Sequence, residues 1–565
     1  MDPTKFDAIT TALATPASRR LALKALTATA VGGPLGLTAI GTALSSCQQQ
    51  QPPQQPSQQP VKMNNVGVTR EQVLAALPKL EQLAQATLKK TGIPGMAITV
   101  VYQDEVLYLK GFGVRKAGGH QQVDADTVFQ LASMSKPVAS TVVAGVVGDG
   151  LVKWDDPIIK HDPTFQMDNP YVTREVTLRD MFSHRSGLPD HAGDRLEDLG
   201  FDRAIVLQRL RYLPTGGNFR ATYAYTNFGL TEAAVAAAKA AGKSWEDLSA
   251  TRLYQQLGMK QTSSRFADYE AASNRALLHV PVDGKWVARY TREPDAQSPA
   301  GGVSSSVRDM AQWLRLQLGN GTFEGKPVIA ADALAETHRP QILRTPKPQN
   351  PVTDRAGLYG LGWNVSYDQQ AAIRLSHSGG FNLGAATAVT LLPSEKLGIV
   401  ALTNAHPIGV PEALNNSFFD LVLNGKVTRD WVELFGKVFP TLFAPDYGTK
   451  VDYTKPPAHP APALSPAAYA GTYHNDFYGE IEIAARDGGL VLEQGPKKTV
   501  FPMKHFDGNV FTYQPVGENA YGLSGVTFTV GADGKAKSVV VENLDVYGQG
   551  PFTRVPARVQ ISLLP

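Results

Sequence analysis

The chain has 565 residues, which is too long for one hydrophobic core and predicts two or more domains. Its hydrophobic content of 43% and charged content of 19% are those of an ordinary globular protein. A formal net charge of +3 gives no electrostatic basis for binding nucleic acid, so we expect no nucleic-acid partner.

The N-terminal segment differs in kind from the rest of the chain. Arg19 and Arg20 precede an apolar stretch of Ala, Thr, Gly and Leu that ends near Ala43. Its glycines suit the mildly hydrophobic core of an export signal better than a membrane-spanning helix. The pattern resembles a twin-arginine signal, and the Leu-Ser-Ser-Cys run that ends at Cys47 resembles a lipobox. We therefore expect residues 1–47 to be a lipoprotein signal.

Cys47 is the only cysteine, so the chain can form no intramolecular disulfide. As the lipidated first residue of a mature bacterial lipoprotein, it would hold the protein on a membrane without any spanning helix. Residues 48–66, rich in Gln and Pro, are expected to form a flexible tether. Gln48 resembles an outer-membrane sorting signal, which predicts a periplasm-facing location in the bacterial envelope.

Globular composition begins at Thr69. Thr69 and Gln72 have the spacing of a capping box, which predicts a helix to about Lys90. The segments 96–102 and 106–114 are separated by a short polar turn and predict a β-hairpin.

Ser133 and Lys136 lie at the start of an apolar helical pattern. Because Pro137 cannot occupy a helix interior without a clash, the helix begins no earlier than about Ser133. Residues three apart on a helix lie on one face, so the two side chains can share a proton. A lysine with a lowered pKa can then activate the serine as a nucleophile. The structural alternative is a serine cap beside an exposed lysine.

Two further segments carry candidate site residues. Tyr225 and Asn227 are two apart before an Ala-rich helix, so both can face one cleft, although an interfacial Tyr and a turn Asn would look the same. Later, a strand ends in His377, Ser378, Gly379 and Gly380, where the glycines can bring backbone N–H groups close to a ligand. Such donors could form an oxyanion hole.

A metal site is not expected. His184 and His191 are the histidines that could be considered as ligands, but neither an H-E-x-x-H motif nor a Cys/His spacing accompanies them.

The C-terminal segment is predicted to be rich in β-strands. Residues 451–466 are proline-rich and predict an interdomain linker. Beyond them, the Asp-Gly pairs at 487–488, 507–508 and 533–534 predict hairpin turns of a small antiparallel sheet or barrel.

The motifs Ser133-Met134-Ser135-Lys136, Tyr225-Thr226-Asn227 and His377-Ser378-Gly379 resemble, in this order, those of the penicillin-recognising serine hydrolases related to class C β-lactamases. The resemblance covers about residues 69–430 and implies an α/β fold, an antiparallel sheet flanked by helices with a helical subdomain. It places the hydrolase domain at 67–450. Residues 467–565 resemble the lipocalin-like all-β domain of some members, which implies an accessory role.

The resemblance also implies roles for the site residues. Ser133 would attack a carbonyl, Lys136 and Tyr225 would share the proton transfers, and Asn227 would orient the substrate amide. His377 and Gly379 would line the cleft. The N–H groups of Ser133 and Gly380 would hold the oxyanion, and the reaction would need neither a metal nor an organic cofactor.

His377 departs from the lysine found in many β-lactamases and penicillin-binding proteins. A histidine is only partly charged at neutral pH and would bind a substrate carboxylate more weakly. We therefore predict a serine hydrolase that forms an acyl-enzyme with small esters or amides, D-amino-acid peptides being one candidate substrate class. The alternatives are a β-lactamase or D-Ala-D-Ala carboxypeptidase, and an inactive protein that binds cell-wall material in the same cleft.

Overall fold

The computed structural model describes residues 67–556 except 216–217, 345–355, 368–370 and 443–444. The expected export signal, Cys47 and the whole of the expected tether therefore lie outside the described residues. Within the described part of the chain, no helix is both long enough and apolar enough to span a membrane.

An eight-stranded sheet forms the centre of the larger body, in the order β2-β1-β14-β13-β12-β11-β10-β9. Every neighbouring pair is antiparallel. The strands are β1 (Gly95–Tyr102), β2 (Glu105–Gly113), β9 (Ile342–Leu343), β10 (Leu358–Tyr359), β11 (Asn364–Tyr367), β12 (Ile373–Phe381), β13 (Ala385–Leu392) and β14 (Leu397–Thr403).

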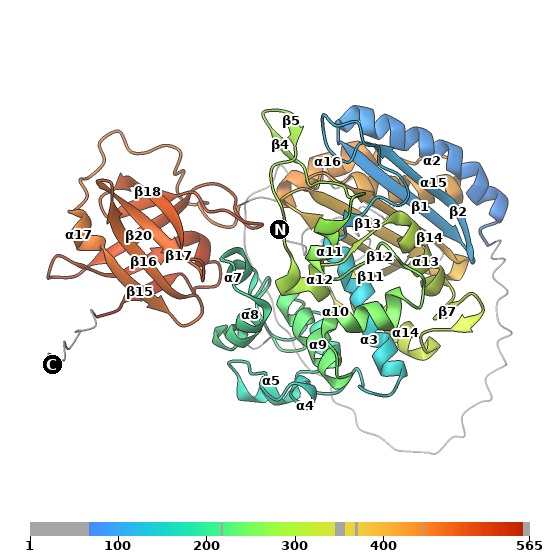
Figure 1. The fold of residues 1–565 in the computed structure, drawn as a ribbon, viewed down its shortest axis with the longest axis horizontal. Coiled ribbons are helices and arrows are strands. Elements are labelled where there is room, and N and C mark those ends of the chain that lie inside the picture. Colours follow the sequence, from blue (N-terminus) through green and yellow to red (C-terminus); the bar gives the residue numbers. More distant parts are fainter. Residues whose placement is uncertain (1–66, 216–217, 345–355, 368–370, 443–444, 557–565) are drawn as a thin grey trace, which may run out of the picture.

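Both faces of this sheet are buried, because alternate residues of β1 enter different hydrophobic cores. Ile98 and Val100 pack with α2 and α15 on one face, whereas Ala97 and Val101 belong to the core shared with α3, α9 and α13 on the other. Figure 1 shows α2 and α15 together on one side of the sheet. The longer helices are α2 (Arg70–Thr91), α3 (Ser135–Gly148), α9 (Asn227–Ala240), α13 (Val307–Leu318), α14 (Ala331–His338), α15 (Val410–Asn424) and α16 (Trp431–Leu442).

Short helices between α3 and the later strands form the helical subdomain. They are α4 (Ile158–His161), α5 (Pro170–Glu175), α6 (Leu178–Phe182), α7 (Asp194–Asp198), α8 (Arg203–Arg209), α10 (Trp245–Ser249), α11 (Phe266–Ala271) and α12 (Ser298–Gly301). Three small antiparallel pairs complete this body: β3 (Phe129–Gln130) with β6 (Ser304–Ser305), β4 (Val280–Val282) with β5 (Lys285–Val287), and β7 (Thr322–Phe323) with β8 (Lys326–Pro327).

The local predictions for the N-terminal part of this body are confirmed. Thr69 caps α2 and forms a capping box with Gln72. The strands β1 and β2 form the expected hairpin. The sheet flanked by helices is the architecture that the motif resemblance implied.

The C-terminal segment forms a closed barrel of eight strands in sequence order. A short helix, α17 (Pro466–Tyr469), precedes it. The strands are β15 (Gly471–Asn475), β16 (Gly479–Arg486), β17 (Gly489–Gln494), β18 (Thr499–Asp507), β19 (Val510–Tyr513), β20 (Ser524–Val530), β21 (Ala536–Val541) and β22 (Pro551–Arg554). The expected hairpin turns join β16 to β17, β18 to β19 and β20 to β21. The prediction of a small all-β unit is thus confirmed.

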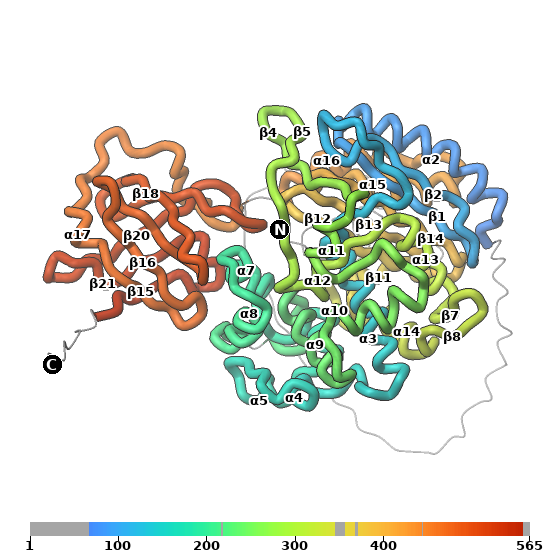
Figure 2. The backbone as a smooth tube through the Cα atoms, in the orientation of Figure 1, coloured from blue at the N-terminus to red at the C-terminus, as the bar shows by residue number. Residues whose placement is uncertain are grey.

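The barrel lies beside the helical subdomain, next to α7 and α8 (Figure 1). The backbone trace shows the same arrangement, with the barrel separated from α2 by the whole larger body (Figure 2). Arg209 at the end of α8 donates a hydrogen bond to the carbonyl of Phe477 in the barrel at 3.1 Å.

Candidate active site

Ser133 lies in a short 3-10 turn, Ala132–Met134, that leads directly into α3. Ala132 has φ of 48°, in the left-handed region that a non-glycine residue adopts at a cost. The Ser133 side chain remains partly exposed, whereas Lys136, one turn later, is completely buried. The sequence prediction that Ser133 lies at the helix start is confirmed.

Gly379 allows strand β12 to lie directly against this turn. A β-carbon at position 379 would stand 2.1 Å from the carbonyl oxygen of Leu131 and 2.9 Å from the amide nitrogen of Met134. The side chain of Thr387 on β13 also donates a hydrogen bond to the Leu131 carbonyl, at 2.7 Å. The His-Ser-Gly-Gly segment and the serine turn are therefore neighbours, and Gly380 is the next residue of the strand.

The side chains of the first two motifs meet at Ser133. Its Oγ is 3.1 Å from Lys136 Nζ and 2.9 Å from the hydroxyl of Tyr225, which donates to it. Lys136 Nζ also lies 4.4 Å from the centroid of the Tyr225 ring. The structure thus brings together the three residues that the sequence nominates for proton transfer.

Lys136 Nζ has two further partners. It donates to Asn227 Oδ1 at 2.7 Å and to the backbone carbonyl of Ala300 at 3.0 Å. A neutral amine has two N–H donors and one lone pair. With the donors directed to Asn227 and Ala300, the lone pair is left for the Ser133 hydroxyl proton. This arrangement suits a general base.

Burial sets the protonation states of these groups. Loss of hydration lowers the pKa of Lys136 to about 7, although the nearby charge of Asp194 acts in the opposite direction. Burial raises the pKa of Tyr225 above its ordinary value. At pH 8 a large fraction of Lys136 is therefore a free amine, while Tyr225 keeps its proton and can donate it.

His377 is buried and contacts a tyrosine outside the three motifs. Its Nε2 is 3.0 Å from the hydroxyl of Tyr359 on β10. Burial lowers the pKa of His377 to about 3, and the charge of Lys136 acts in the same direction. His377 is therefore neutral across the physiological range, which is a stronger departure from a fixed positive charge than the sequence alone suggested.

A family model for β-lactamases matches residues 80–420, which is more than half of the chain. The chain belongs to the β-lactamase family. Members of this family are serine hydrolases. A second model, for a domain of unknown function (DUF3471), matches residues 455–551 and so covers most of the barrel.

Several relatives are similar to this β-lactamase-family chain. The unguisins hydrolase ungD of Aspergillus violaceofuscus is 27% identical over 76% of this chain and 82% of its own length. The D-alanyl-D-alanine-carboxypeptidase/endopeptidase AmpH of Escherichia coli K12 is 24% identical over 59% of this chain and 85% of its own. The octameric penicillin-binding protein homologue from Pyrococcus abyssi has a similar fold, with a TM-score of 0.53 at 17% identity over 85% of this chain and all of that one.

Some residues of the site lie outside the three motifs. His184 Nδ1 accepts a hydrogen bond from the Thr226 amide at 3.1 Å, and its ring lies 4.5 Å from that of Tyr225 and 4.9 Å from that of Tyr359.

Buried Arg344 donates to Asn364 at 2.7 Å, and its charge contributes to the low pKa of His377. The Tyr359-Gly-Leu-Gly-Trp run was visible in the sequence, but its closeness to His377 depends on the pairing of distant strands.

Neither of the two histidines considered as metal ligands forms part of a metal cluster. Among the described residues, no group of three or more His, Cys, Asp or Glu side chains is placed to hold a metal ion. His191 Nδ1 instead forms a hydrogen bond with Asp194 Oδ2 at 2.7 Å.

The barrel contacts the segment that follows β12 through the loop between β19 and β20. Asn382, two residues beyond Gly380, donates to the backbone carbonyl of Glu518 at 2.9 Å and to the hydroxyl of Tyr521 at 2.7 Å. Two residues of a strand span about 7 Å. The loop therefore contacts the chain just beyond the end of β12, close to Gly380.

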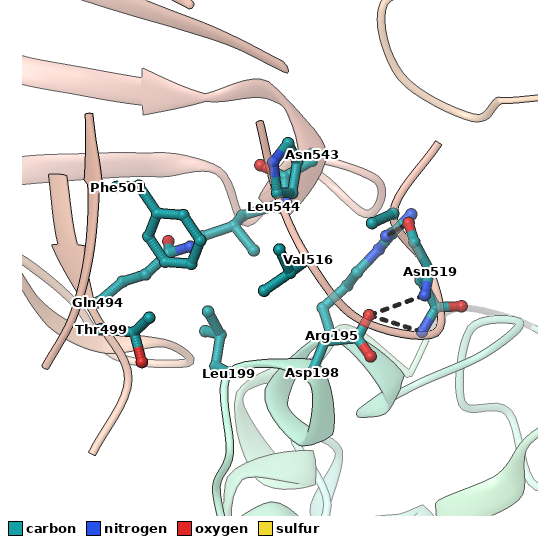
Figure 3. A pocket seen from close by; sticks show the side chains of 12 residues that line it. Arg195, Asp198, Leu199, Gln494, Thr499, Phe501, Val516, Asn519, Asn543 and Leu544 are labelled. Carbon is teal, nitrogen blue, oxygen red and sulfur yellow. Dashed lines mark hydrogen bonds between the residues drawn. The ribbon is translucent and has the colours of Figure 1, made fainter. Parts of the chain in front are cut away.

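A small cavity of about 50 Å³ lies between the barrel and α7 (Figure 3). Its walls include Arg195, Asp198 and Leu199 on one side and Phe501 and Asn519 of the barrel on the other. Ser133 does not line it, so this cavity is distinct from the catalytic cleft.

Proposed function

We propose that the protein is a serine hydrolase that forms an acyl-enzyme through Ser133 and acts on small esters or amides. The observation that carries this proposal is the position of Ser133 Oγ, within hydrogen-bond distance of both Lys136 Nζ and the Tyr225 hydroxyl. A nucleophile bonded to a base of suitable pKa is the arrangement that covalent catalysis needs.

In the proposed first step, Ser133 Oγ attacks the substrate carbonyl while its proton moves to neutral Lys136. The backbone N–H groups of Ser133 and Gly380 stabilise the negative oxygen that forms, each such donor being worth about 3 kcal/mol in acyl transfer. The tetrahedral intermediate then collapses. The C–O or C–N bond breaks, and the leaving group takes a proton from Tyr225, which recovers one from Lys136.

In the second step, water replaces the leaving group and the same residues act in reverse. Lys136 and Tyr225 remove a proton from the water as it attacks the ester carbonyl of the acyl-enzyme. Collapse of that intermediate returns a proton to Ser133 Oγ and releases the acid. Water is the second reactant, and the proton transfers of both steps use Lys136 and Tyr225.

The substrate class is part of the proposal. Because His377 is neutral, the cleft lacks the lysine charge that binds a carboxylate in many β-lactamases. This favours esters and amides, including D-amino-acid peptides, over β-lactams. The name of one relative, a D-alanyl-D-alanine-carboxypeptidase/endopeptidase, is compatible with D-amino-acid peptides as substrates.

A turnover panel tests this function. The substrates are p-nitrophenyl esters, D-amino-acid amides and nitrocefin, and the variants are Ser133→Ala and, as a matched control, Ser273→Ala at an exposed serine. We expect ester or amide hydrolysis in wild type and control, and a fall of about a thousandfold or more in Ser133→Ala. Efficient nitrocefin turnover would instead favour the β-lactamase alternative. Tight binding of cell-wall fragments without any turnover would favour an inactive binding protein.

We also propose that the protein is exported and lipid-anchored through Cys47 in the bacterial envelope. The support is the order of paired arginines, apolar stretch and lipobox in the sequence. Membrane fractionation of wild type and Cys47→Ser tests this. Equal recovery of both proteins in a soluble fraction would contradict it.

A further inference from the structure

Asp194 is a buried carboxylate beside the catalytic residues and belongs to none of the three motifs. It is the first residue of α7 and only 5% exposed. Its Oδ2 accepts hydrogen bonds from His191 Nδ1 at 2.7 Å and from Asn227 Nδ2 at 2.9 Å. Its Oδ1 is buried without a hydrogen-bond partner among the described residues.

These contacts hold the amide of Asn227 in one orientation. The Nδ2 group can donate to the Asp194 carboxylate only if Oδ1 points the other way, and there Oδ1 accepts from Lys136 Nζ at 2.7 Å. A continuous chain of hydrogen bonds therefore runs from Asp194 through Asn227 to Lys136 and on to Ser133.

The charged and titratable groups around Lys136 come from several elements. The ring of Tyr225 lies under the ammonium group of Lys136. Burial and the charge of Lys136 together keep His184 and His377 neutral. Asp194 is the group whose charge favours protonated Lys136. Desolvation therefore lowers the pKa of Lys136, whereas the charge of Asp194 raises it.

We propose that Asp194 is a positioning residue that fixes the amide of Asn227 and thereby holds Lys136 Nζ against Ser133 Oγ. Its negative charge also favours the protonated form of Lys136. This inference rests on the proposed function, because the lysine it concerns is the general base. Lys136 must accept a proton from Ser133 and later release it. A nearby negative charge stabilises the protonated intermediate form.

The same short helix links Asp194 to the barrel. Arg195 donates to the backbone carbonyl of Asn519 in the barrel and forms an ion pair, at 2.7 Å, with Asp446, which precedes the barrel in the chain. Asp198 accepts from the amides of Glu518 and Asn519, at 2.9 and 3.0 Å, and from Asn519 Nδ2 at 2.9 Å. Figure 3 shows Asp198 and Asn519 facing each other across the interface. The barrel thus holds the helix that presents Asp194 to the catalytic residues.

The test measures the rate at which a fluorophosphonate acylates the full chain between pH 5 and 9. In wild type we expect the rate to rise with a midpoint near pH 7, where Lys136 loses its proton. In Asp194→Asn the midpoint should move to lower pH by at least about half a unit, because a negative charge is lost. The rate on the alkaline plateau should fall about tenfold to a hundredfold, because Asn227 and Lys136 are less well held.

Asp198→Asn is the matched control. It removes a carboxylate from the same helix, but that carboxylate binds the barrel rather than Asn227. General loosening of α7 would lower the rate in both variants, whereas the proposal requires a displaced midpoint in Asp194→Asn alone. An unchanged midpoint in Asp194→Asn, or equal displacement in both variants, would overturn the proposal.

A second readout does not depend on catalysis. The Cε resonance of Lys136 can be followed by ¹³C NMR in lysine-labelled protein and assigned by its absence in Lys136→Arg. Its titration midpoint should be lower in Asp194→Asn than in wild type, and equal midpoints would contradict the proposal. A wild-type protein that is not acylated at Ser133 would refute the proposed function, while this titration would still decide the role of Asp194.

Should Asp194→Asn fail to fold, Asp194→Glu replaces it. This variant keeps the charge but lengthens the side chain, so we expect a wild-type midpoint with a reduced plateau rate. A plateau rate equal to that of wild type would contradict the positioning role.

Discussion

Gly379 and Leu131 are packed so closely that a β-carbon on the glycine would stand 2.1 Å from the Leu131 carbonyl oxygen. Because that oxygen belongs to backbone, it cannot move aside as the end of a side chain could. Gly379→Ala should therefore push β12 away from the serine turn. We expect a loss of about 2 to 4 kcal/mol in unfolding free energy and a large fall in activity.

Gly436→Ala is the matched control for this substitution. Gly436 lies in α16, and nothing would stand within 4 Å of its added β-carbon. An alanine should stabilise a helix there by up to about 1 kcal/mol. Chemical denaturation measures both variants, and similar stability changes in the two would contradict the close approach at Gly379.

Lys136→Arg should slow acylation strongly, because it replaces the proposed base with a permanent cation. Arginine stays protonated at every working pH and cannot accept the serine proton. We expect acylation by a fluorophosphonate to slow by a factor of about a hundred or more at pH 8. Retention of more than about a tenth of the wild-type rate would show that another group is the base.

His377→Lys should shift substrate preference toward molecules with a free carboxylate. The substitution replaces a neutral histidine with a lysine, whose higher ordinary pKa makes it the more readily charged of the two at this position. We expect KM for nitrocefin, which carries a carboxylate, to fall about tenfold relative to KM for an uncharged p-nitrophenyl ester. Parallel changes in the two KM values would indicate that position 377 does not contact the carboxylate.

Asp198→Ala should loosen the barrel loop. The substitution removes three hydrogen bonds to Glu518 and Asn519. We expect faster hydrogen exchange at residues 516–521 and a loss of about 1 to 3 kcal/mol in unfolding free energy. Asp476→Ala, at an exposed barrel position, serves as the control and should leave exchange in that loop unchanged.

His338 should make the protein less stable in acid. Its side chain packs edge-on against Trp363, and burial lowers its pKa to about 4 from an ordinary value of 6.5. Between these two values the unfolded chain binds a proton that the folded chain does not, so stability is complete above pH 6.5 and falls as the pH drops toward 4. The loss is about 1.4 kcal/mol per pH unit.

The measurement is chemical denaturation of His338→Gln and wild type at pH 6.5 and 4.5. The variant should lose less stability over this interval, whereas His474→Gln, at an exposed histidine, should behave like wild type. Equal losses in wild type and His338→Gln would show that His338 is not the group responsible.

The sequence predicted those parts of the site that depend on local pattern. The Ser133 turn, the α2 capping box and the β1–β2 hairpin follow from short-range spacing, and the three ordered motifs indicated which distant segments meet. Asp194 and Tyr359 were not predicted, because their roles arise from contacts between segments with no fixed spacing. The His377 pKa likewise depends on burial, which one sequence does not give.

The barrel illustrates the same limit. Its strands and Asp-Gly turns could be predicted from the sequence, but its packing against α7 and α8 could not. Contacts such as Asp198 with Asn519 join residues more than three hundred positions apart. Hydrogen-bonding partners on two separate surfaces leave no periodic pattern in the sequence, so the position of the barrel beside α7 came from the structure alone.

The most direct test of the central claim is the mass of the intact protein after reaction with a fluorophosphonate, followed by peptide mapping. We predict one adduct per chain on wild type, located at Ser133, the same adduct on Ser273→Ala, and none on Ser133→Ala. Equal labelling of wild type and Ser133→Ala would contradict the assignment of Ser133 as the nucleophile.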